Sequence, residues 1–552
     1  MERRALLATI LALLVLVLYQ YFFMPAPPAP PPTGPEKEVA QEAKAPAVAV
    51  TSLPPAKVPR VIGPLRRGER EEEITLETDL LRVTFTNRGG GVRSWQLKQY
   101  RDASGPVDLV GPLGEGTTSL PFTAWIPEGE GREGLYRILE RPGADPTKPQ
   151  RVVMEFQEAG GLLVEKMVVL YPGRYLADVQ VRLKNLGAVA TQAALRLQWG
   201  PGFRQGAEDQ AAEAAHPVAW VDGKLLTPDV EELDQELTQS GAVSFTALQD
   251  RYFAAALIPE KPTPSGLVAR DEAGRPVVGL LYPATELPLG GEMGVELQVY
   301  AGPKEIARLR DAGHNLQRLV NLGWFDFVAR PALHLLRFLY DFTANYGVAI
   351  IIITILQKMA FYPLTQKSLK SMQAMQALQP KIQAIRERYK NNPQKINQET
   401  MELYKRHGVN PVGGCLPMVI QIPIFIALYN ALASSVELWR APFCLWIDDL
   451  SQPDTIYTIR DLFGIQAFDL RGLPLIMGIS MYIQQKMSPT SGDPRQAQMM
   501  LYLMPVMFTF LFWGFPSGLV LYWLVNNVLQ VGQQYLLNRG LLISRVAGKE
   551  AE

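Results

Sequence analysis

Residues 345–540 contain about five apolar runs that are interrupted by polar side chains. Apolar runs of this kind are typical of membrane helices, and a charged side chain at the centre of a bilayer costs about 2.5–3.5 kcal/mol or more. Polar residues at such depth therefore face the interior of a helix bundle or a water-filled cavity. The interrupting residues are Lys358, Gln421, Gln484, Asn526, Asn527 and Gln530. We predict a membrane bundle with a polar interior.

The charge balance of the whole chain excludes one large class of partners. The 552 residues carry 54 Lys and Arg against 54 Asp and Glu, a net charge of +0. This balance predicts no specific nucleic-acid recognition. The two cysteines, Cys415 and Cys444, flank one apolar run, so they are too far apart for a disulfide and are expected to be packing residues.

The N-terminus is expected to be a membrane anchor. Residues 1–24 contain two arginines followed by an apolar run long enough to span a bilayer. A cleaved signal peptide is the alternative, but it has a shorter apolar core and a small-residue cleavage site. The arginines hold the N-terminus in the cytoplasm, so the following residues are exported. Residues 25–68 are rich in Pro and Ala and predict a solvated linker.

Residues 69–304 have the period-two pattern of β-strands. Ala177, Val179, Val181 and Leu183 alternate with polar residues, and glycine-rich turns such as 87–91 separate similar runs. This pattern predicts an exported, all-β sandwich of antiparallel sheets. A sugar-binding or sugar-processing role for this domain remains a hypothesis. The 4 histidines are dispersed and no nucleophile, phosphate-binding or metal-binding motif is present, so we expect no catalytic site, metal or cofactor.

Residues 305–344 connect this domain to the apolar core. Within them, residues 323–342 combine apolar and aromatic side chains with charges at helical spacing. The pattern predicts an amphipathic helix at the membrane surface. The alternative is a final helix of the β-domain.

The core, residues 345–540, is predicted to hold five spans at 346–364, 413–433, 473–487, 499–515 and 518–537. Several are shorter than the roughly 20 residues that a bilayer requires, so local thinning is expected. The basic insert at 366–409 predicts a cytoplasmic helical hairpin, broken once near residue 392. We expect the hairpin to receive clients through Met372, Met375, Lys381, Arg386 and Arg388. The N-terminal anchor and the five core spans make six crossings, an even number. The N-terminus and the C-terminal tail at 541–552 are therefore both predicted to be cytoplasmic.

Several ordered strings in the core carry a family resemblance. They are NYGVAI at 345–350, YPLT at 362–365, LQPK at 378–381, NPVGGCLP at 410–417, QIPIF at 421–425, QKMSP at 485–489 and FPSGLVLY at 515–522. Together they resemble the YidC/Oxa family of membrane protein insertases. The β-domain resembles, more loosely, the large periplasmic super-sandwich of Gram-negative members.

The resemblance implies a five-helix core with a hydrophilic groove open to the cytoplasm and lipid but closed on the exported side. It implies an insertase and chaperone of the bacterial inner membrane that hydrolyses no nucleotide and is not an enzyme. Its partners would be nascent membrane proteins, membrane lipids, the Sec translocon and the ribosome. The positive groove residue, usually arginine in the family, corresponds to Lys358, which lacks the guanidinium fork. The expected groove residues are Thr354, Lys358, Gln421, Tyr522, Asn526 and Gln530.

Alternative interpretations remain open from the residues themselves. Lys358 could extend to the cytoplasmic headgroups, and Gln484 and Gln485 could only join helices to one another. The polar groove could also serve a small-solute transporter or channel. Water access from one side only would favour insertion, whereas access from both sides in turn would favour transport.

Overall fold

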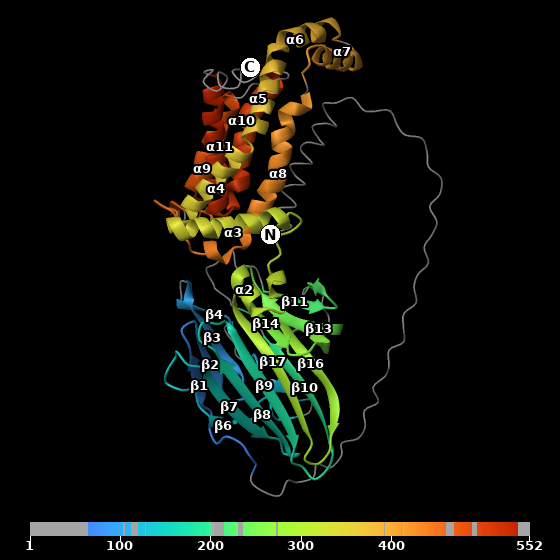
Figure 1. Ribbon diagram of the computed structural model, residues 1–552, viewed down its shortest axis with the longest axis vertical. Coiled ribbons are helices and arrows are strands. Elements are labelled where there is room, and N and C mark those ends of the chain that lie inside the picture. Colours follow the sequence, from blue (N-terminus) through green and yellow to red (C-terminus); the bar gives the residue numbers. More distant parts are fainter. Residues whose placement is uncertain are drawn as a thin grey trace, which may run out of the picture. The chain divides into compact units, whose positions relative to one another are not determined.

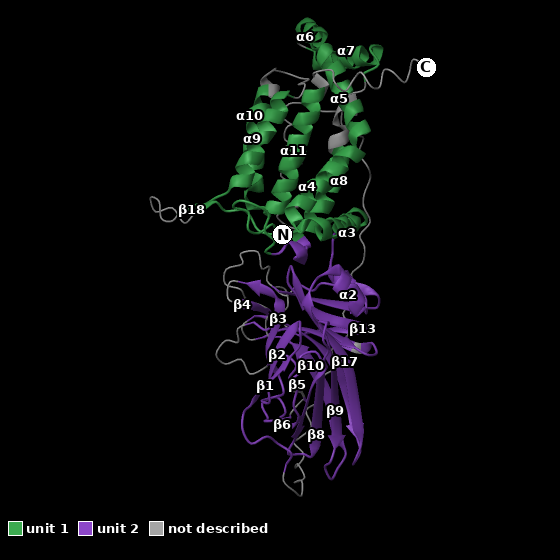
Figure 2. Cartoon of the chain, turned by 60° about the vertical axis from the view of Figure 1, so that its left-hand side comes forward, with its two compact units in different colours: residues 1–55, 324–433, 440–552 green, residues 56–323, 434–439 purple. Residues whose placement is uncertain are grey.

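The computed structural model describes residues 65–538, apart from 103–104, 112–119, 127–128, 201–202, 204–214, 230–235, 272–273, 391, 410, 460–467 and 488–493. The predicted N-terminal anchor, most of the linker and the C-terminal tail lie outside the described residues. The chain divides into two compact units (Figure 2). One is helical and contains residues 324–433 and 440–552 together with 1–55; the other is mostly β-sheet and contains residues 56–323 and 434–439.

The β unit consists of antiparallel sheets. A four-stranded sheet has the order β1-β2-β3-β4, and a larger sheet follows the path β5-β10-β16-β15-β13-β14-β17-β9-β8-β7-β6, with β11 and β12 attached through β13. The strands of the small sheet are β1 (Glu73–Glu77), β2 (Leu81–Thr86), β3 (Val92–Asp102) and β4 (Gly105–Asp108). Those of the large sheet are β5 (Ala124–Trp125), β6 (Arg137–Glu140), β7 (Gln150–Gln157), β8 (Leu162–Leu170), β9 (Leu176–Asn185), β10 (Thr191–Trp199), β11 (His216–Val221), β12 (Lys224–Leu226), β13 (Leu237–Gln249), β14 (Phe253–Pro259), β15 (Thr263–Arg270), β16 (Pro276–Leu287) and β17 (Glu292–Pro303).

The predicted alternation is confirmed in β9, where Ala177, Val179, Val181 and Leu183 are all buried. The centre of the unit is aromatic. Trp95 of the small sheet and Trp199 of the large sheet are both fully buried, with ring centroids 5.6 Å apart. Burial of such large rings from both sheets stabilises the sandwich. The unit also contains α2 (Ile306–Ala312) and the short 3-10 helices η2 (Leu316–Leu319) and η3 (Val436–Leu438).

One charged side chain is completely buried in this unit. Lys166 of β8 has 0% exposure, and its Nζ donates to the carbonyl oxygen of Gly90 at 2.6 Å and to that of Phe122. Gly90 lies in the glycine-rich turn between β2 and β3 with φ +59°, a conformation that favours glycine. Lys166 therefore joins strand β8 to two turns through backbone acceptors.

The helical unit contains ten helices among the described residues (Figure 1). They are α3 (Asp326–Thr343), α4 (Tyr346–Ala360), α5 (Tyr362–Ala377), α6 (Gln379–Arg388), α7 (Pro393–Arg406), α8 (Pro411–Ser434), α9 (Gly472–Met487), α10 (Pro494–Leu511), η4 (Phe512–Gly514) and α11 (Ser517–Asn538). A two-stranded hairpin, β18 (Tyr457–Ile459) and β19 (Phe468–Leu470), precedes α9. Among the described helices, none is by itself both long and apolar enough to cross a membrane, whereas α4 and α5 together are, with a bend of 63° between them.

The break between α4 and α5 differs from the single continuous span predicted for 346–364. Phe361 separates the two helices, and Pro363 lies in the first turn of α5. Proline lacks the amide that would continue the helical bonding of the preceding turn, so it begins a new helix more readily than it extends an old one. The hairpin has a second unpredicted break at Leu378, where Pro380 lies in the first turn of α6.

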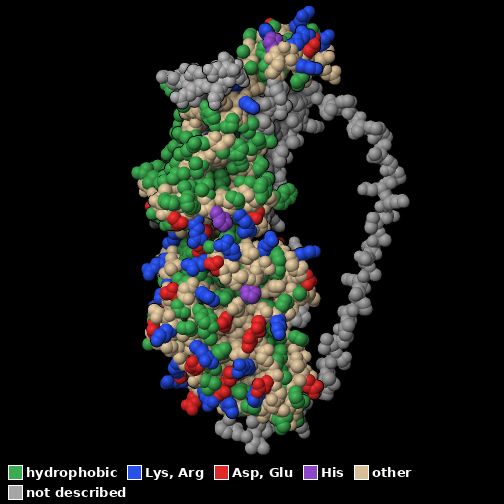
Figure 3. Space-filling model, viewed as in Figure 1, with side chains coloured by type: hydrophobic (Ala, Val, Ile, Leu, Met, Phe, Trp, Pro, Cys, Tyr) green, Lys and Arg blue, Asp and Glu red, His purple; other side chains and the backbone are tan. Residues whose placement is uncertain are grey.

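The surface of the helical unit is largely apolar in the view of Figure 3, whereas Lys, Arg, Asp and Glu are scattered over the β unit in that view. Exposed apolar residues occur on several core helices. Ile479 is 62% exposed on α9, Phe510 is 72% exposed on α10 and Val528 is 54% exposed on α11. A surface of this kind is suited to lipid rather than water.

Cys444 is an exposed free thiol, so the prediction that it is a packing residue is wrong.

Candidate functional site: a polar layer between three helices

Helix α4 carries the lysine that the sequence singles out. Asn345 caps its N-terminus by accepting a hydrogen bond from the amide of Val348 at 3.1 Å. Thr354, one turn before Lys358, is fully buried, and its hydroxyl donates to the carbonyl oxygen of Ile350 at 2.7 Å. Thr354 thus satisfies its hydroxyl within its own helix. The following turn brings Gln357 and Lys358 to neighbouring helices.

Two sets of side-chain hydrogen bonds connect α4, α8 and α11. The Nζ of Lys358 donates to Oε1 of Gln530 on α11 at 2.7 Å. The Nε2 of Gln421 on α8 donates to the hydroxyl of Tyr522 at 2.6 Å, and that hydroxyl donates to Oε1 of Gln357 at 3.2 Å. We call these five residues the polar layer. Sequence analysis placed four of them in the groove and missed Gln357.

The polar layer is half-buried apart from Tyr522, which is 1% exposed. Amide and ammonium groups at this depth keep hydrogen-bonding partners, which lowers the cost of holding them away from water. The bond from Lys358 to Gln530 directs the ammonium toward α11. This geometry does not match the alternative in which Lys358 extends to the headgroups.

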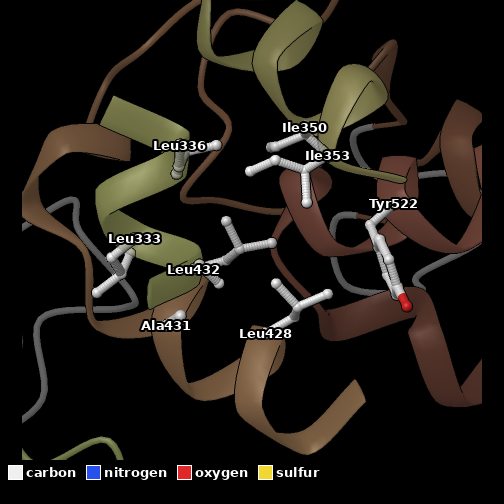
Figure 4. A pocket seen from close by; sticks show the side chains of 9 residues that line it. Leu333, Leu336, Ile350, Ile353, Leu428, Ala431, Leu432 and Tyr522 are labelled. Carbon is white, nitrogen blue, oxygen red and sulfur yellow. The ribbon is translucent and has the colours of Figure 1, made fainter. Parts of the chain in front are cut away.

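An apolar layer adjoins the polar one. A cavity of about 10 Å³ lies among α3, α4, α8 and α11 (Figure 4). Its lining consists of Ala332, Leu333, Leu336, Ile350, Ile353, Leu428, Ala431, Leu432 and Tyr522. A buried water needs roughly 10–15 Å³ and 2–4 polar partners, which this lining does not offer, so we expect the cavity to be dry.

Tyr522 forms the boundary between the two layers. Its ring lines the cavity, and in Figure 4 its hydroxyl points away from Leu333 and Leu336. The same hydroxyl carries both hydrogen bonds to Gln421 and Gln357. A single side chain therefore separates an apolar compartment from a polar one.

The remaining predicted amides have different surroundings. Asn526 is half-buried and lies one turn from both Tyr522 and Gln530 on α11. Its neighbour Asn527 is 4% exposed and donates from Nδ2 to the hydroxyl of Ser480 on α9 at 3.2 Å. Asn527 thus joins two helices, which is the role that sequence analysis left open for Gln484 and Gln485.

The predicted hairpin residues lie on two helices, the methionines on α5 and the basic residues on α6. Met375 is buried and Met372 is half-buried, whereas Lys381 and Arg388 are exposed and Arg386 is half-buried. The Nζ of Lys381 lies 3.1 Å from Nε2 of His407, beyond the end of α7. The methionines therefore serve packing at least in part, and most of the basic groups face solvent.

The predicted amphipathic helix is α3, which belongs to the helical unit rather than the β unit. Its Ala329 and Leu336 are buried, while Phe327 and Phe342 are each 74% exposed. Trp324, just before the helix, is 95% exposed. Exposed aromatic rings beside an apolar helix surface are typical of the membrane interface.

Comparison with known proteins covers both units. The family of the 60Kd inner membrane protein matches residues 338–544, and the YidC periplasmic domain family matches residues 73–335. The membrane protein insertase YidC of Syntrophus aciditrophicus is 36% identical over 570 residues, covering 98% of this chain and 100% of the relative. That of Geotalea daltonii is 37% identical over 552 residues, with the same coverage. A crystal structure of an active YidC insertase with its first transmembrane domain resolved is 21% identical, covers 86% of this chain and 94% of that one, and has a TM-score of 0.37.

A polar layer inside an apolar helical unit, joined to an all-β unit, defines a multi-domain membrane protein with a hydrophilic interior. The two family matches and the full-length relatives make the assignment specific: the chain belongs to the YidC family of membrane protein insertases. It is thus a membrane protein insertase of the inner membrane with a periplasmic domain that is mostly β-sheet.

Proposed function

We propose that clients enter the membrane through the polar layer of Gln357, Lys358, Gln421, Tyr522 and Gln530. The observation that carries this proposal is the set of hydrogen bonds that these residues make across α4, α8 and α11. When the polar tail of a client enters, the polar-layer residues can replace the hydrogen bonds among themselves by hydrogen bonds to the backbone and side chains of the client. It then avoids the cost of unpaired polar groups in hydrocarbon, which is several kcal/mol per group.

The apolar segment of the client leaves the layer toward lipid. Exposed apolar residues of α9, α10 and α11 offer an apolar environment that suits this segment. Each Leu, Ile, Phe or Val that reaches the bilayer centre contributes about −0.3 to −0.6 kcal/mol. Insertion is driven by this transfer and needs no nucleotide hydrolysis, and the same surfaces act as a chaperone for partly inserted helices.

Lys358 attracts acidic groups in the client tail. Its partner Gln530 is a neutral amide, so a client carboxylate that reaches Nζ gains a charge-assisted bond in place of a weaker one. Because lysine is a point charge with three rotatable donors, it needs no bidentate geometry. Lysine at this position therefore suffices for electrostatic recruitment.

The hairpin of α5, α6 and α7 receives clients on the cytoplasmic side. Its exposed basic side chains suit an acidic client or the surface of a ribosome, and the Sec translocon is a further partner for multi-span clients. With the hairpin on the cytoplasmic side, both termini are also cytoplasmic and the β unit is periplasmic. Helix α3 then lies at the interface between membrane and periplasm.

Site-specific crosslinking tests this route. A photoreactive residue at Asn526, on the same face as Tyr522 and Gln530, should crosslink to ribosome-bound nascent clients. The matched control is the adjacent Asn527, which faces Ser480 of α9 and should crosslink to α9 instead. Equal client crosslinking at both positions, or at neither, would refute entry along this face of α11.

A further inference from the structure

The segment from residue 440 to 456, here called the α8–α9 loop, is bonded to the first turns of three core helices. At α4, Nδ2 of Asn345 donates to the carbonyl oxygen of Phe443 at 3.0 Å. The Phe443 ring also packs so closely on Gly347 that a Cβ there would have no room. This end of the loop is therefore fixed to the residue that caps α4.

At α11, the bonds come from the first residues of the helix. The hydroxyl of Ser517 donates to the carbonyl oxygen of Asp449 at 2.6 Å, and its amide donates to that of Gln452 at 2.7 Å. The amide of Gly518 donates to the carbonyl oxygen of Leu450 at 2.9 Å. First-turn amides have no partner within their own helix, so the loop supplies acceptors that α11 cannot supply itself.

At α9, one carboxylate oxygen accepts three hydrogen bonds. Oδ2 of Asp454 accepts from the amides of Gly472 and Leu473, each at 2.8 Å, and from the indole Nε1 of Trp446 at 2.9 Å. Asp454 is 4% exposed. A negative charge at a helix N-terminus is stabilised by the helix dipole, and charge-assisted bonds are about twice as strong as neutral ones.

The ring of Trp446 completes this contact. A Cβ on Gly472 would lie 2.8 Å from Cζ2 of Trp446 and 2.6 Å from Cδ1 of Ile456. Only a glycine at the start of α9 lets the loop approach so closely. Asp454 thus fixes both the backbone of α9 and the large ring that covers its first turn.

The loop and the polar layer lie at different levels along α4. Gln357 follows Asn345 by 12 residues, which corresponds to about 18 Å along the helix axis. The dry cavity bounded by Ile350, Ile353 and the ring of Tyr522 lies between them. A path along α4 and α11 from the polar layer therefore meets apolar side chains and then the loop.

We propose that the α8–α9 loop is a permeability seal across the exported ends of α4, α9 and α11, and that Asp454 is the positioning residue that holds it closed. The proposal rests on the insertion route through the polar layer. Its function is to keep ions from crossing while the polar layer is hydrated. Loss of the three bonds to Asp454 loosens the loop at the first turn of α9, where the amide of Ile456 still donates to the carbonyl oxygen of Leu470. It leaves the N–H groups of Gly472, Leu473 and Trp446 without this acceptor.

The test reconstitutes the full-length protein in liposomes and measures proton or potassium leak separately from client insertion. Asp454→Ala should raise the leak several-fold, and Asp454→Asn, which retains acceptor oxygen but not charge, should raise it less. The matched control is Asp448→Ala, an exposed carboxylate of the same loop, which should leave the leak at the wild-type level. Thermal unfolding of each variant identifies those that fold normally.

Two milder variants keep the test decisive if Asp454→Ala does not fold. Trp446→Phe removes only the indole donor, and Ser517→Ala removes only the hydroxyl donor at α11. Each should give an intermediate leak in a folded protein. A folded Asp454 variant, or both milder variants, leaking no more than Asp448→Ala would overturn the seal. Raised leak with retained insertion supports the seal. A normal leak overturns the seal whatever happens to insertion, and the insertion route itself is tested separately by the crosslinking at Asn526 and Asn527.

Discussion

Lys166 in the β unit and Lys358 in the helical unit are both removed from water, but their surroundings differ. Lys166 is fully buried and donates to the backbone carbonyl oxygens of Gly90 and Phe122. Lys358 is half-buried and donates to the side chain of Gln530. Backbone acceptors in turns cannot leave without unfolding the turns, whereas a glutamine side chain can rotate away. A lysine with fixed acceptors serves structure, and on the proposed insertion route the exchangeable acceptor of Lys358 leaves its ammonium available to a client.

The two units also have opposite arrangements of polar and apolar groups. In the β unit the apolar faces of the strands point inward and charged side chains are scattered over the surface. In the helical unit, apolar residues such as Ile479 and Phe510 are exposed, and amides lie inside. The solvent decides which arrangement is stable: lipid accepts exposed apolar groups, and a hydrogen-bonded polar interior can then serve transfer.

The largest expected effect comes from reversing the charge of Lys358. Lys358→Glu should reduce insertion of clients with acidic tails at least about tenfold, equivalent to about 1.4 kcal/mol, because it repels the tail that Lys358 attracts. Lys358→Ala should have a smaller effect, and Lys358→Arg should retain activity because the charge is kept. The measurement is insertion of a short single-span client into membranes containing equal amounts of each variant.

Lys486→Glu is the control for this series, since Lys486 is an exposed cation in the last turn of α9. Its reversal changes the net charge of the core by the same amount and should leave insertion close to wild type. Full activity of Lys358→Glu on an acidic-tailed client would exclude electrostatic attraction as the role of this residue.

Sequence periodicity predicted a β-sandwich followed by a helical core because burial repeats along each element. The strands and most helix ends follow from alternating or continuous apolar residues. The break at Phe361 was missed because the apolar run continues through it, and only Pro363 gave a local signal. Asp454 was missed because it caps a helix 18 residues later in the chain, and such a contact leaves no periodic trace. Gln357 was overlooked beside the more conspicuous charge of Lys358.

The second prediction concerns the hairpin, which should matter less than Lys358 for a client already at the membrane. Replacing residues 379–406 by a short flexible connection should lower client delivery while the core retains its melting temperature. The reason is that the hydrogen bonds of the polar layer and of the α8–α9 loop involve none of these residues. Insertion and thermal unfolding of the purified protein are measured together.

A charge-neutralised hairpin, Arg388→Gln with Lys390→Gln, is the matched variant because both side chains are exposed. It should show part of the delivery defect if basic groups recruit clients. Unchanged insertion by the shortened protein would show that the hairpin is no receiving platform. Joint loss of insertion and stability would instead make it a structural element.

The third prediction uses the buried lysine of the β unit. Burial lowers the pKa of Lys166 from 10.5 to about 7. Between these values the unfolded chain binds a proton that the folded unit does not, so the free energy of unfolding should rise with pH. The rise from this group is at most about 1.4 kcal/mol per pH unit. Lys166→Met should therefore flatten the gain in stability between pH 7 and pH 9.

Urea unfolding of the β unit within the full chain, followed by proteolysis of the unfolded fraction at each pH, measures this slope. Lys184→Met is the control, because Lys184 lies on the adjacent strand β9 with its side chain 43% exposed and paired with Glu292. It should keep the wild-type slope. Equal slopes in the wild type and in Lys166→Met would contradict a lowered pKa in the folded state.

The smallest expected effect on insertion comes from removing most of the β unit. Deletion of residues 69–304, with the anchor and α3 kept, should leave insertion of a single-span client nearly unchanged, because none of the polar-layer residues belongs to that unit. The deletion has one structural consequence. Trp439, which belongs to the β unit, packs its ring 5.3 Å from that of Phe253, 6.0 Å from that of Tyr100 and 6.3 Å from that of Tyr252, and it would lose all three of these partners.

The deletion is therefore best made together with Trp439→Ser, which removes the newly exposed ring. The combined variant should reach the membrane in normal amount and insert the client at close to the wild-type rate. Retained insertion would assign the activity to the helical unit alone. If the combined variant accumulates normally yet fails to insert the client, the β unit contributes directly to insertion, and the contrast between a structural Lys166 and a functional Lys358 no longer separates the roles of the two units.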